Sequence, residues 1–319
     1  MEKKKGGGAL LEEMSFSCGK ITEENLAAFR ERSRLLSDAR TAELSFLADR
    51  VAEHAAGLYV DGMGLYEILS LVSEGIVLAD ASEDDGGEGA RAFFQQTYDR
   101  AIFSSLLLEK LKERGISPTE SDFLPTEEVP ETFTYVKNAY ADEAYEVFSS
   151  EFSDPRVKYA GTFSEAVKSV LNGEVGYCLL PLAERGGVRL SSVTELLAGN
   201  DLKIASVTPV FGFSGDAELR YALVARTFRV PTVAAEDDRY LEIRCSEEDG
   251  DTLATLLCAA RVFCASLYRV HTVTRRTPEN GFYYTVVFRT EGKSFVGLLT
   301  YLTLYTETYI PVGIYKNLE

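Results

Sequence analysis

The sequence predicts a multidomain protein of α and α/β parts: a helical module, a single α/β module and a C-terminal ferredoxin-like module, in that order. Three observations predict this class. Apolar residues recur with a helical period in the first third of the chain, and strand and helix patterns alternate beyond it. Two linkers separate the parts: 115–131, which is rich in proline and acidic residues, and 229–239. We expect a flexible tail over 1–19, a helical domain over 20–117, an α/β domain over 131–230 and a C-terminal domain over 238–319.

The composition bounds the function classes. A chain of 319 residues with 45% hydrophobic and 26% charged residues is typical of a globular protein with real cores. No apolar run approaches the ~18 residues of a membrane span, and the basic start precedes too short an apolar segment for a secretory signal, so we expect a cytoplasmic protein with no membrane partner. The net charge of −17 repels phosphate backbones and argues against nucleic acid. The 5 cysteines are scattered and there are only 2 histidines, so we expect no metal site and no cofactor.

The helical module is predicted to contain one long, one short and one medium helix. The first runs from Ile21 with no glycine or proline until Gly57, and the others cover 65–73 and about 90–114. The long helix carries one apolar stripe: Phe29, Leu36, Leu47, Val51 and Leu58. Such helices bury their stripes against one another or in a dimer.

Polar residues interrupt that stripe. Ser33, Arg40 and His54 lie on the same side of the helix, and unpartnered polar groups in a packing seam cost free energy. They mark a solvated edge or an internal polar site. We interpret His54 as a partnered residue of the bundle rather than a proton donor.

The α/β module shows strands and helices in alternation, which implies a mainly parallel sheet. The predicted strands are 133–136, 157–159, 175–181, 203–210 and 221–225, and the predicted helices are 139–152, 162–171 and 191–197.

The C-terminal module has the element order β-α-β-β-α-β of a ferredoxin-like sandwich. The six elements are predicted at 240–245, 251–267, 268–276, 282–289, 294–303 and 309–315. Cys264 lies on the apolar stripe of the first helix and is expected to be buried, and Asn280-Gly281 predicts a hairpin turn. The apolar last strand needs covering, which pairing with a second copy would supply, so we expect a homodimer or a dimer of dimers.

The segment VGYCLLPLAERGGVRLSSVTELL (175–197), together with the order of the three modules, resembles the bifunctional chorismate mutase–prephenate dehydratase family of phenylalanine biosynthesis, which ends in an ACT domain. The resemblance implies a chorismate-mutase-like helical module, a prephenate-dehydratase-like α/β module and an ACT domain. Ala183, Glu184 and Arg185 replace the family's Glu-Asn-Ser/Thr, and the middle module is too short for the family's two lobes. A dehydratase with one lobe lacks an enclosed cleft.

The resemblance also supplies candidate catalytic residues. ELRYALVAR (218–226) is similar to the family's dehydratase segment, with Arg220 as its arginine but Leu219 in place of the threonine that acts on the departing hydroxyl. Arg30 matches the first arginine of the mutase helix. Leu47 stands where the second is expected, and Ser104 stands near the position of the family's glutamine.

The ACT resemblance implies a ligand site for L-phenylalanine, another aromatic amino acid or prephenate. The residues that match the family's two binding motifs are Gly250, Asp251, Thr252, Leu253, Thr274, Arg275 and Arg276. VGIYKNL (312–318) is similar to the closing strand with its G-x-Y.

Three functions remain open from the sequence. The first is a catalytically impaired member of this family that acts as an ACT-mediated sensor or regulatory dimer. The second is an active prephenate dehydratase, which converts prephenate to phenylpyruvate, water and CO2, with or without mutase activity. The third is a structural partner without a ligand.

Overall fold

The computed structural model describes residues 23–80, 90–184, 187–211, 219–231, 237–246, 252–274, 282–306 and 309–318. Backbone contacts divide the chain into two units, Met1–Leu47 and Ala48–Glu319, so the division falls inside the first helix. The expected tail over 1–19 lies outside the described residues, and the expected domain boundaries stay predictions. Among the described residues, no helix combines the length and apolar character needed to cross a membrane.

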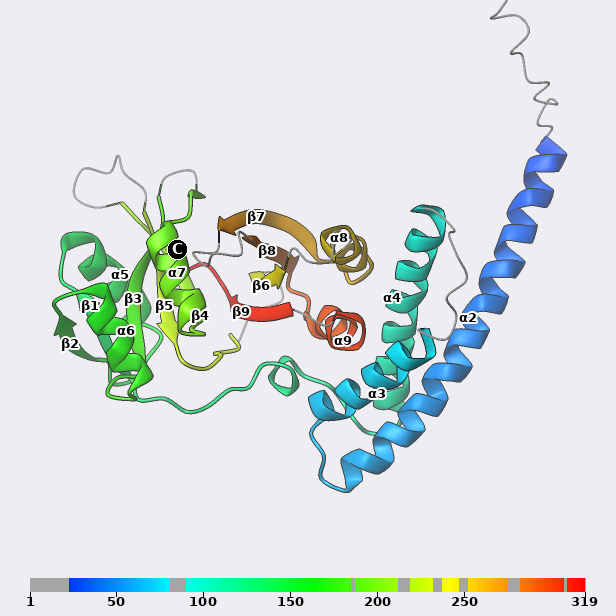
Figure 1. Ribbon diagram of the computed structural model, residues 1–319, viewed down its shortest axis with the longest axis horizontal. Coiled ribbons are helices and arrows are strands. Elements are labelled where there is room, and N and C mark those ends of the chain that lie inside the picture. The colour runs from blue at the N-terminus through cyan, green and yellow to red at the C-terminus, as the bar shows by residue number, and fades with distance from the viewer. Residues whose placement is uncertain are drawn as a thin grey trace, which may run out of the picture. The chain divides into compact units, whose positions relative to one another are not determined.

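Three helices open the described chain: α2 (Glu23–Val60), α3 (Leu65–Asp80) and α4 (Ala90–Glu113) (Figure 1). The predicted apolar face of α2 is wrong. Leu36 and Leu47 are 66% and 46% exposed, whereas Ala48 and Ala52 are fully buried. Closely packed helices often have small side chains such as alanine at their contact. A search for a stripe of large apolar residues does not find such a contact face. His54 is exposed, as are Ser33 and Arg40, so this side of α2 is a solvated edge and His54 is not a packed bundle residue.

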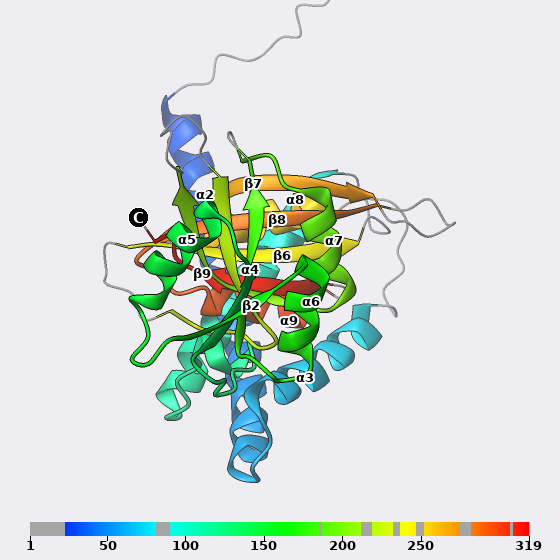
Figure 2. The same ribbon diagram turned by 90° about the vertical axis from the view of Figure 1, so that its left-hand side faces the viewer.

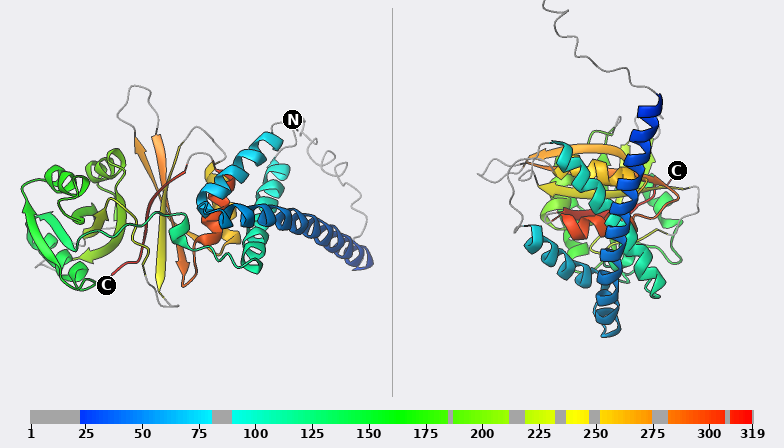
Figure 3. Two further views of the ribbon diagram at one scale, coloured as in Figure 1. Left: turned by 90° about the horizontal axis from the view of Figure 1, so that it is seen from below. Right: turned by 90° about the vertical axis from the view of Figure 1, so that its right-hand side faces the viewer.

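Helices α3 and α4 do not form a closed bundle of their own. They pack against α8 (Thr252–Val262) and α9 (Val296–Tyr305) of the C-terminal part, as Figure 1 and the left view of Figure 3 show. Ser73 donates a hydrogen bond to the carbonyl of Leu304 at 2.8 Å, and the Arg100 guanidinium lies 5.1 Å from the centre of the Tyr305 ring. Part of the apolar surface of these helices is therefore covered within the chain, while Tyr66, Leu71 and Tyr98 stay exposed.

The strands form one sheet of nine, in the order β2-β1-β3-β5-β4-β9-β6-β8-β7. Their bounds are β1 (Thr132–Val136), β2 (Arg156–Ala160), β3 (Tyr177–Ala183), β4 (Lys203–Val210), β5 (Leu219–Ala225), β6 (Asp238–Ser246), β7 (Ser266–Thr274), β8 (Phe282–Glu291) and β9 (Tyr309–Tyr315). Strand β1 is parallel to β2 and β3, but β5 is antiparallel to both β3 and β4. Strand β4 therefore runs in the same direction as β1, β2 and β3, as a mainly parallel first half requires, and β5 alone runs opposite. The pair β4–β5 is antiparallel because these strands follow each other with too few residues for a crossover helix.

Three helices cover both faces of β1–β5: α5 (Ala139–Ser149) on one side and α6 (Phe163–Leu171) with α7 (Ser191–Gly199) on the other (Figure 2). Polar residues begin two of them. The Asn138 side chain accepts a hydrogen bond from the Ala141 amide, and the Thr162 hydroxyl accepts one from the Glu165 amide.

The last six elements follow the predicted order β6, α8, β7, β8, α9, β9, with antiparallel pairs β9-β6, β6-β8 and β8-β7. Helix α8 ends five residues before the predicted end at Leu267. Cys264 lies beyond it, exposed and with φ of 58°, so the expectation of a buried cysteine is wrong. The Asn280-Gly281 turn lies outside the described residues.

Strand β9 is not an edge strand. It pairs with β6 on one side and with β4 on the other, where Ile204 lies opposite Gly313 and the Leu318 amide donates to the Val207 carbonyl at 2.8 Å. The edge that suggested a partner copy is therefore covered by β4 of the same chain. We call this contact of β4 with β9 the sheet junction.

The stretch between α4 and β1 is anchored rather than free. It contains a 3-10 turn, η1 (Glu120–Asp122), and the side chain of Glu120 is only 6% exposed. One carboxylate oxygen of Glu120 pairs with Arg239 at the start of β6, and the other accepts from the Phe295 amide at 2.8 Å and the Ser294 hydroxyl at 3.2 Å. The sequence predicted a linker here from its acidic composition. One of those acidic residues, Glu120, is instead buried and fixes the segment to β6 and to the start of α9.

Candidate functional site

The end of β3 and the edge strand β7 enclose a pocket. After β3 the chain turns back, with the Glu184 amide donating to the Val188 carbonyl at 2.9 Å and the Leu190 amide to the Leu182 carbonyl at 3.1 Å. This turn directs Arg189 toward β7. We call the pocket between this turn, α7 and β7 the arginine site; it is lined by Gly187, Val188, Arg189, Ser191, Thr194, Glu195, Arg269, Val270, His271 and Thr272.

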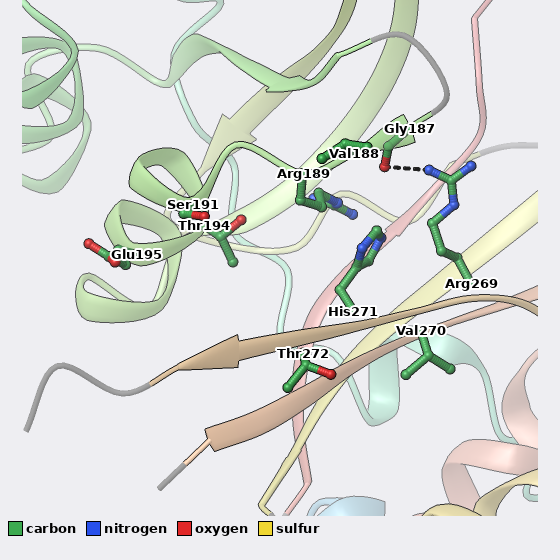
Figure 4. A pocket seen from close by; sticks show the side chains of 10 residues that line it. All are labelled: Gly187, Val188, Arg189, Ser191, Thr194, Glu195, Arg269, Val270, His271 and Thr272. Carbon is green, nitrogen blue, oxygen red and sulfur yellow. Dashed lines mark hydrogen bonds between the residues drawn. The ribbon is translucent and has the colours of Figure 1, made fainter. Parts of the chain in front are cut away.

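Strand alternation places the basic side chains of β7 on one face. Arg269 and His271 point toward the turn after β3, and Val270 and Thr272 point away from it (Figure 4). The pocket has a volume of about 510 Å³, which is enough for a small metabolite.

The Arg269 guanidinium is held against the backbone of Gly187. Its Nη1 donates to the Gly187 carbonyl at 2.5 Å (Figure 4). Gly187 has φ of 78°, and a Cβ at this position would lie 1.4 Å from that Nη1, so only glycine fits. No described carboxylate pairs with Arg269, and its positive charge is available to the pocket.

Arg189 is held from behind by a buried carboxylate. Its Nη2 pairs with an oxygen of Glu242 on β6, which also accepts the hydroxyl of Tyr315 on β9 at 3.0 Å. Burial, followed by the Glu242 charge, raises the pKa of Tyr315 well above its ordinary value, so this phenol keeps its proton and remains a donor.

His271 lies between the arginines. Burial, and then the charges of Arg189 and Arg269, lower its pKa from 6.5 to about 4. At neutral pH it is therefore an uncharged imidazole. It is a poor proton donor, and the positive charge of the site comes from the guanidinium groups.

A third arginine lies behind the pocket wall. Arg220 on β5 stands opposite Ala183 and donates to the Tyr268 hydroxyl at 3.4 Å. With Arg189 and Arg269 it borders a cavity of about 30 Å³, the size of a single water molecule, which adjoins the arginine site.

The chemistry of the arginine site favours an anion. Guanidinium groups held by the fold bind carboxylates and phosphates with directed, charge-assisted hydrogen bonds. Ser191 and Thr194 of α7 also line the pocket, and no side chain of a described residue caps the start of this helix. A helix start without a cap presents amide donors to the same negative group.

The sequence-predicted site residues are only partly brought together. Arg220 adjoins the arginine site, whereas Arg30 is exposed on α2, in the other unit. Thr252 begins α8, Thr274 ends β7 and Leu253 is half-buried on α8. Gly250, Asp251, Arg275 and Arg276 lie outside the described residues, so the ACT-like ligand site stays a prediction.

The sequence interpretation missed Arg189, Glu242, Arg269 and His271. They come from three separate parts of the chain and form no motif. One signal was present: Glu242 interrupts the strand YLEIRC (240–245) between Leu241 and Ile243, and a charged residue inside a buried strand needs a partner. In the described part of the chain, histidine, cysteine and acidic side chains do not gather into a set that could hold a metal ion.

Comparison with known proteins finds no matching family model and no matching curated protein. Among solved structures, the chain is similar to prephenate dehydratase from Streptococcus mutans (12% identity, 59% of this chain and 99% of that chain, TM-score 0.48). It is also similar to GqqA, a quorum-quenching acylase (15% identity, 58% and 95%, TM-score 0.45). A third is prephenate dehydratase from Arthrobacter aurescens in complex with L-Phe (11% identity, 58% and 90%, TM-score 0.44).

Proposed function

We propose that this chain is a binding protein that holds a small carboxylate ligand in the arginine site without converting it. The observation that carries the proposal is Arg269, whose guanidinium is fixed on Gly187 beside Arg189 at a pocket of about 510 Å³. Two guanidinium groups at one pocket form a local positive site in a chain of net charge −17, and such a site is complementary to an anion.

The lining supports binding more than turnover. Loss of water from prephenate needs an acid for the hydroxyl, and His271, with a pKa of about 4, offers no proton at neutral pH. Leu219, at the start of β5, stands where the resembling family has its threonine. A regulatory or sensor role in phenylalanine biosynthesis is therefore the function we favour, with L-phenylalanine, phenylpyruvate and prephenate as the carboxylates to test. The homodimer stays a prediction that light scattering measures.

Thermal unfolding with each of these three carboxylates tests the proposal. At 100 times its dissociation constant a ligand stabilises the folded state by about 2.7 kcal/mol, which raises the melting temperature by a few degrees. We expect at least one to stabilise the wild type and Arg156→Gln, a control at an arginine whose side chain is 75% exposed, but not Arg269→Gln. If none of the three shifts the wild type, the proposal is wrong.

An activity assay separates the alternative. Incubation with prephenate is expected to release no phenylpyruvate above the uncatalysed rate. Release that Arg220→Gln abolishes would instead support an active dehydratase, because Arg220 is the residue that matches the family's catalytic segment.

A further inference from the structure

A buried carboxylate lies directly behind the arginine site. The side chain of Glu242 is 3% exposed, and its neighbours on β6, Leu241 and Ile243, are fully buried. An ionised carboxylate in such surroundings costs several kcal/mol of desolvation unless it is paired. Its position in the strand therefore needs an explanation beyond packing.

Glu242 divides its contacts between a fixed partner and a pocket residue. The Tyr315 hydroxyl, from a side chain that is 4% exposed, donates to Oε2 at 3.0 Å, and Arg189 pairs with the same oxygen. Arg189 uses only one of its nitrogen atoms for this pair and lines the pocket as well. A guanidinium has five N–H donors in a planar fork, so a pocket ligand can reach Arg189 while Tyr315 still holds Glu242.

Charge also requires a counter-ion here. Arg189 and Arg269 are close enough to His271 that both lower the pKa of its imidazole, so two cations act on one small volume. Glu242 is the described carboxylate that pairs with Arg189, whereas Glu195, the acidic residue of the pocket lining, lies on α7 and points away from both arginines (Figure 4). With Glu242 in place, Arg189 is neutralised and the charge of Arg269 is left for the ligand.

We infer that Glu242 is the internal counter-ion of the arginine site: it neutralises Arg189 while the site is empty and thereby sets a low affinity for the anionic ligand. The inference rests on the proposed function, because it assigns a role within the same site. Glu242 acts on the ligand indirectly, through Arg189, and so it determines affinity without touching the ligand. A carboxylate that enters the pocket competes with Glu242 for the fork of Arg189.

The first test removes the charge of Glu242 and keeps its shape. We expect Glu242→Gln to bind malonate, used as a simple dicarboxylate probe, about tenfold more tightly than the wild type in calorimetric titration at constant ionic strength, since charge pairs of this kind carry measurable coupling. The same variant is expected to melt at a lower temperature without malonate and to gain more from malonate than the wild type.

Glu120→Gln is the matched control. It breaks the other buried pair, Glu120 with Arg239, whose side chains are 6% and 8% exposed, at a place away from the pocket. We expect this variant to lose stability like Glu242→Gln but to keep the wild-type affinity for malonate. Equal tightening in both variants would mean that general loosening, not charge, acts on the site.

A second variant covers the case in which Glu242→Gln does not fold. The double change Arg189→Met and Glu242→Leu replaces the pair by apolar residues, which proteins tolerate well. Because this change removes the competing carboxylate together with the arginine that the ligand would gain, we expect malonate affinity equal to or lower than that of the wild type. A folded Glu242→Gln that binds no tighter than the wild type, or a double variant that binds malonate tighter than the wild type, overturns the inference. Absence of malonate binding in every variant contradicts the proposed function instead.

Discussion

His271 lies between two guanidinium groups, so its titration reports the charge of the arginine site. Burial is the first cause of its lowered pKa, and Arg189 and Arg269 add to it. The two arginines lie on different elements: Arg189 on the turn after β3, and Arg269 on β7, two residues before His271. Because the imidazole is neutral, the positive charge of the site comes from the two arginines alone, and an arginine keeps its charge over the whole physiological pH range.

The pH dependence of stability follows from this shift. The folded pKa of about 4 lies below the ordinary 6.5, so the unfolded chain binds a proton that the folded chain resists. The contribution of the neutral imidazole is complete above pH 6.5 and is lost as the pH falls toward 4. We expect the stability difference between wild type and His271→Gln to shrink by up to about 2 kcal/mol over this range, after allowance for partial exposure of the ring. Denaturant unfolding of both proteins at pH 4.5 and pH 7 measures it, and a difference independent of pH would contradict the assigned burial.

At the scale of elements, the anchor formed by Glu120 joins three of them. Its two carboxylate oxygens reach Arg239 at the start of β6 and the Phe295 amide just before α9, from a turn that follows α4. An amide at the start of a helix has no hydrogen-bond acceptor within the helix, so the carboxylate of Glu120 supplies one. Its negative charge also interacts favourably with the positive end of the helix dipole. The turn η1 therefore positions α9, against which α3 and α4 pack.

Breaking this anchor has a large expected cost. Glu120→Gln leaves the Arg239 guanidinium buried without a counter-charge, and loss of one partner of a buried pair typically costs 3–5 kcal/mol. We expect the midpoint of urea unfolding to fall accordingly, with amide exchange rising first around Phe295. Asp122→Asn in the same turn is the comparison: its carboxylate bonds to Thr119 at an exposed position, so we expect a cost below about 1 kcal/mol. Similar costs for the two variants would show that the turn, and not the buried pair, holds α9.

Local pattern predicted the elements well and their faces less well. Strands such as 203–210 and 309–315 were predicted with the bounds that the structure has, because continuous apolar and β-branched runs between turns leave one choice. The face of α2 and the end of α8 were predicted wrongly, since alanines and a single residue with positive φ depend on what packs nearby. The arginine site depends on long-range contacts: Arg189 and Glu242 are 53 residues apart, and no local pattern relates them.

In the larger unit, Ala48–Glu319, the sheet junction determines where the arginine site forms. Across three neighbouring strands, Glu242 lies opposite Gly313, and Gly313 lies opposite Ile204. Two residues further on, Tyr315 donates to Glu242. The junction therefore brings the carboxylate of β6 and the phenol of β9 to the end of β3, where Arg189 meets them. The sequence predicted both halves of the sheet but not their union, because one residue pair and a bridge join strands about a hundred positions apart.

Gly313 is the position at which this union can be broken. A Cβ there would lie 2.6 Å from the Ile204 carbonyl oxygen, so any side chain pushes β9 away from β4. We expect Gly313→Val to lower stability by about 1–3 kcal/mol through overpacking. We also expect it to raise ligand affinity at the arginine site, because Glu242 shifts with β9 and no longer neutralises Arg189 fully. Gly199→Ala at the end of α7, where a Cβ meets nothing within 4 Å, is the control and is expected to leave both stability and ligand affinity unchanged.

Hydrogen exchange at the amide of Leu318, which donates across the junction, measures the opening of the junction directly. Protection there as strong in Gly313→Val as in the wild type would mean that the two halves of the sheet are held together by other contacts, and that the arginine site does not depend on the junction.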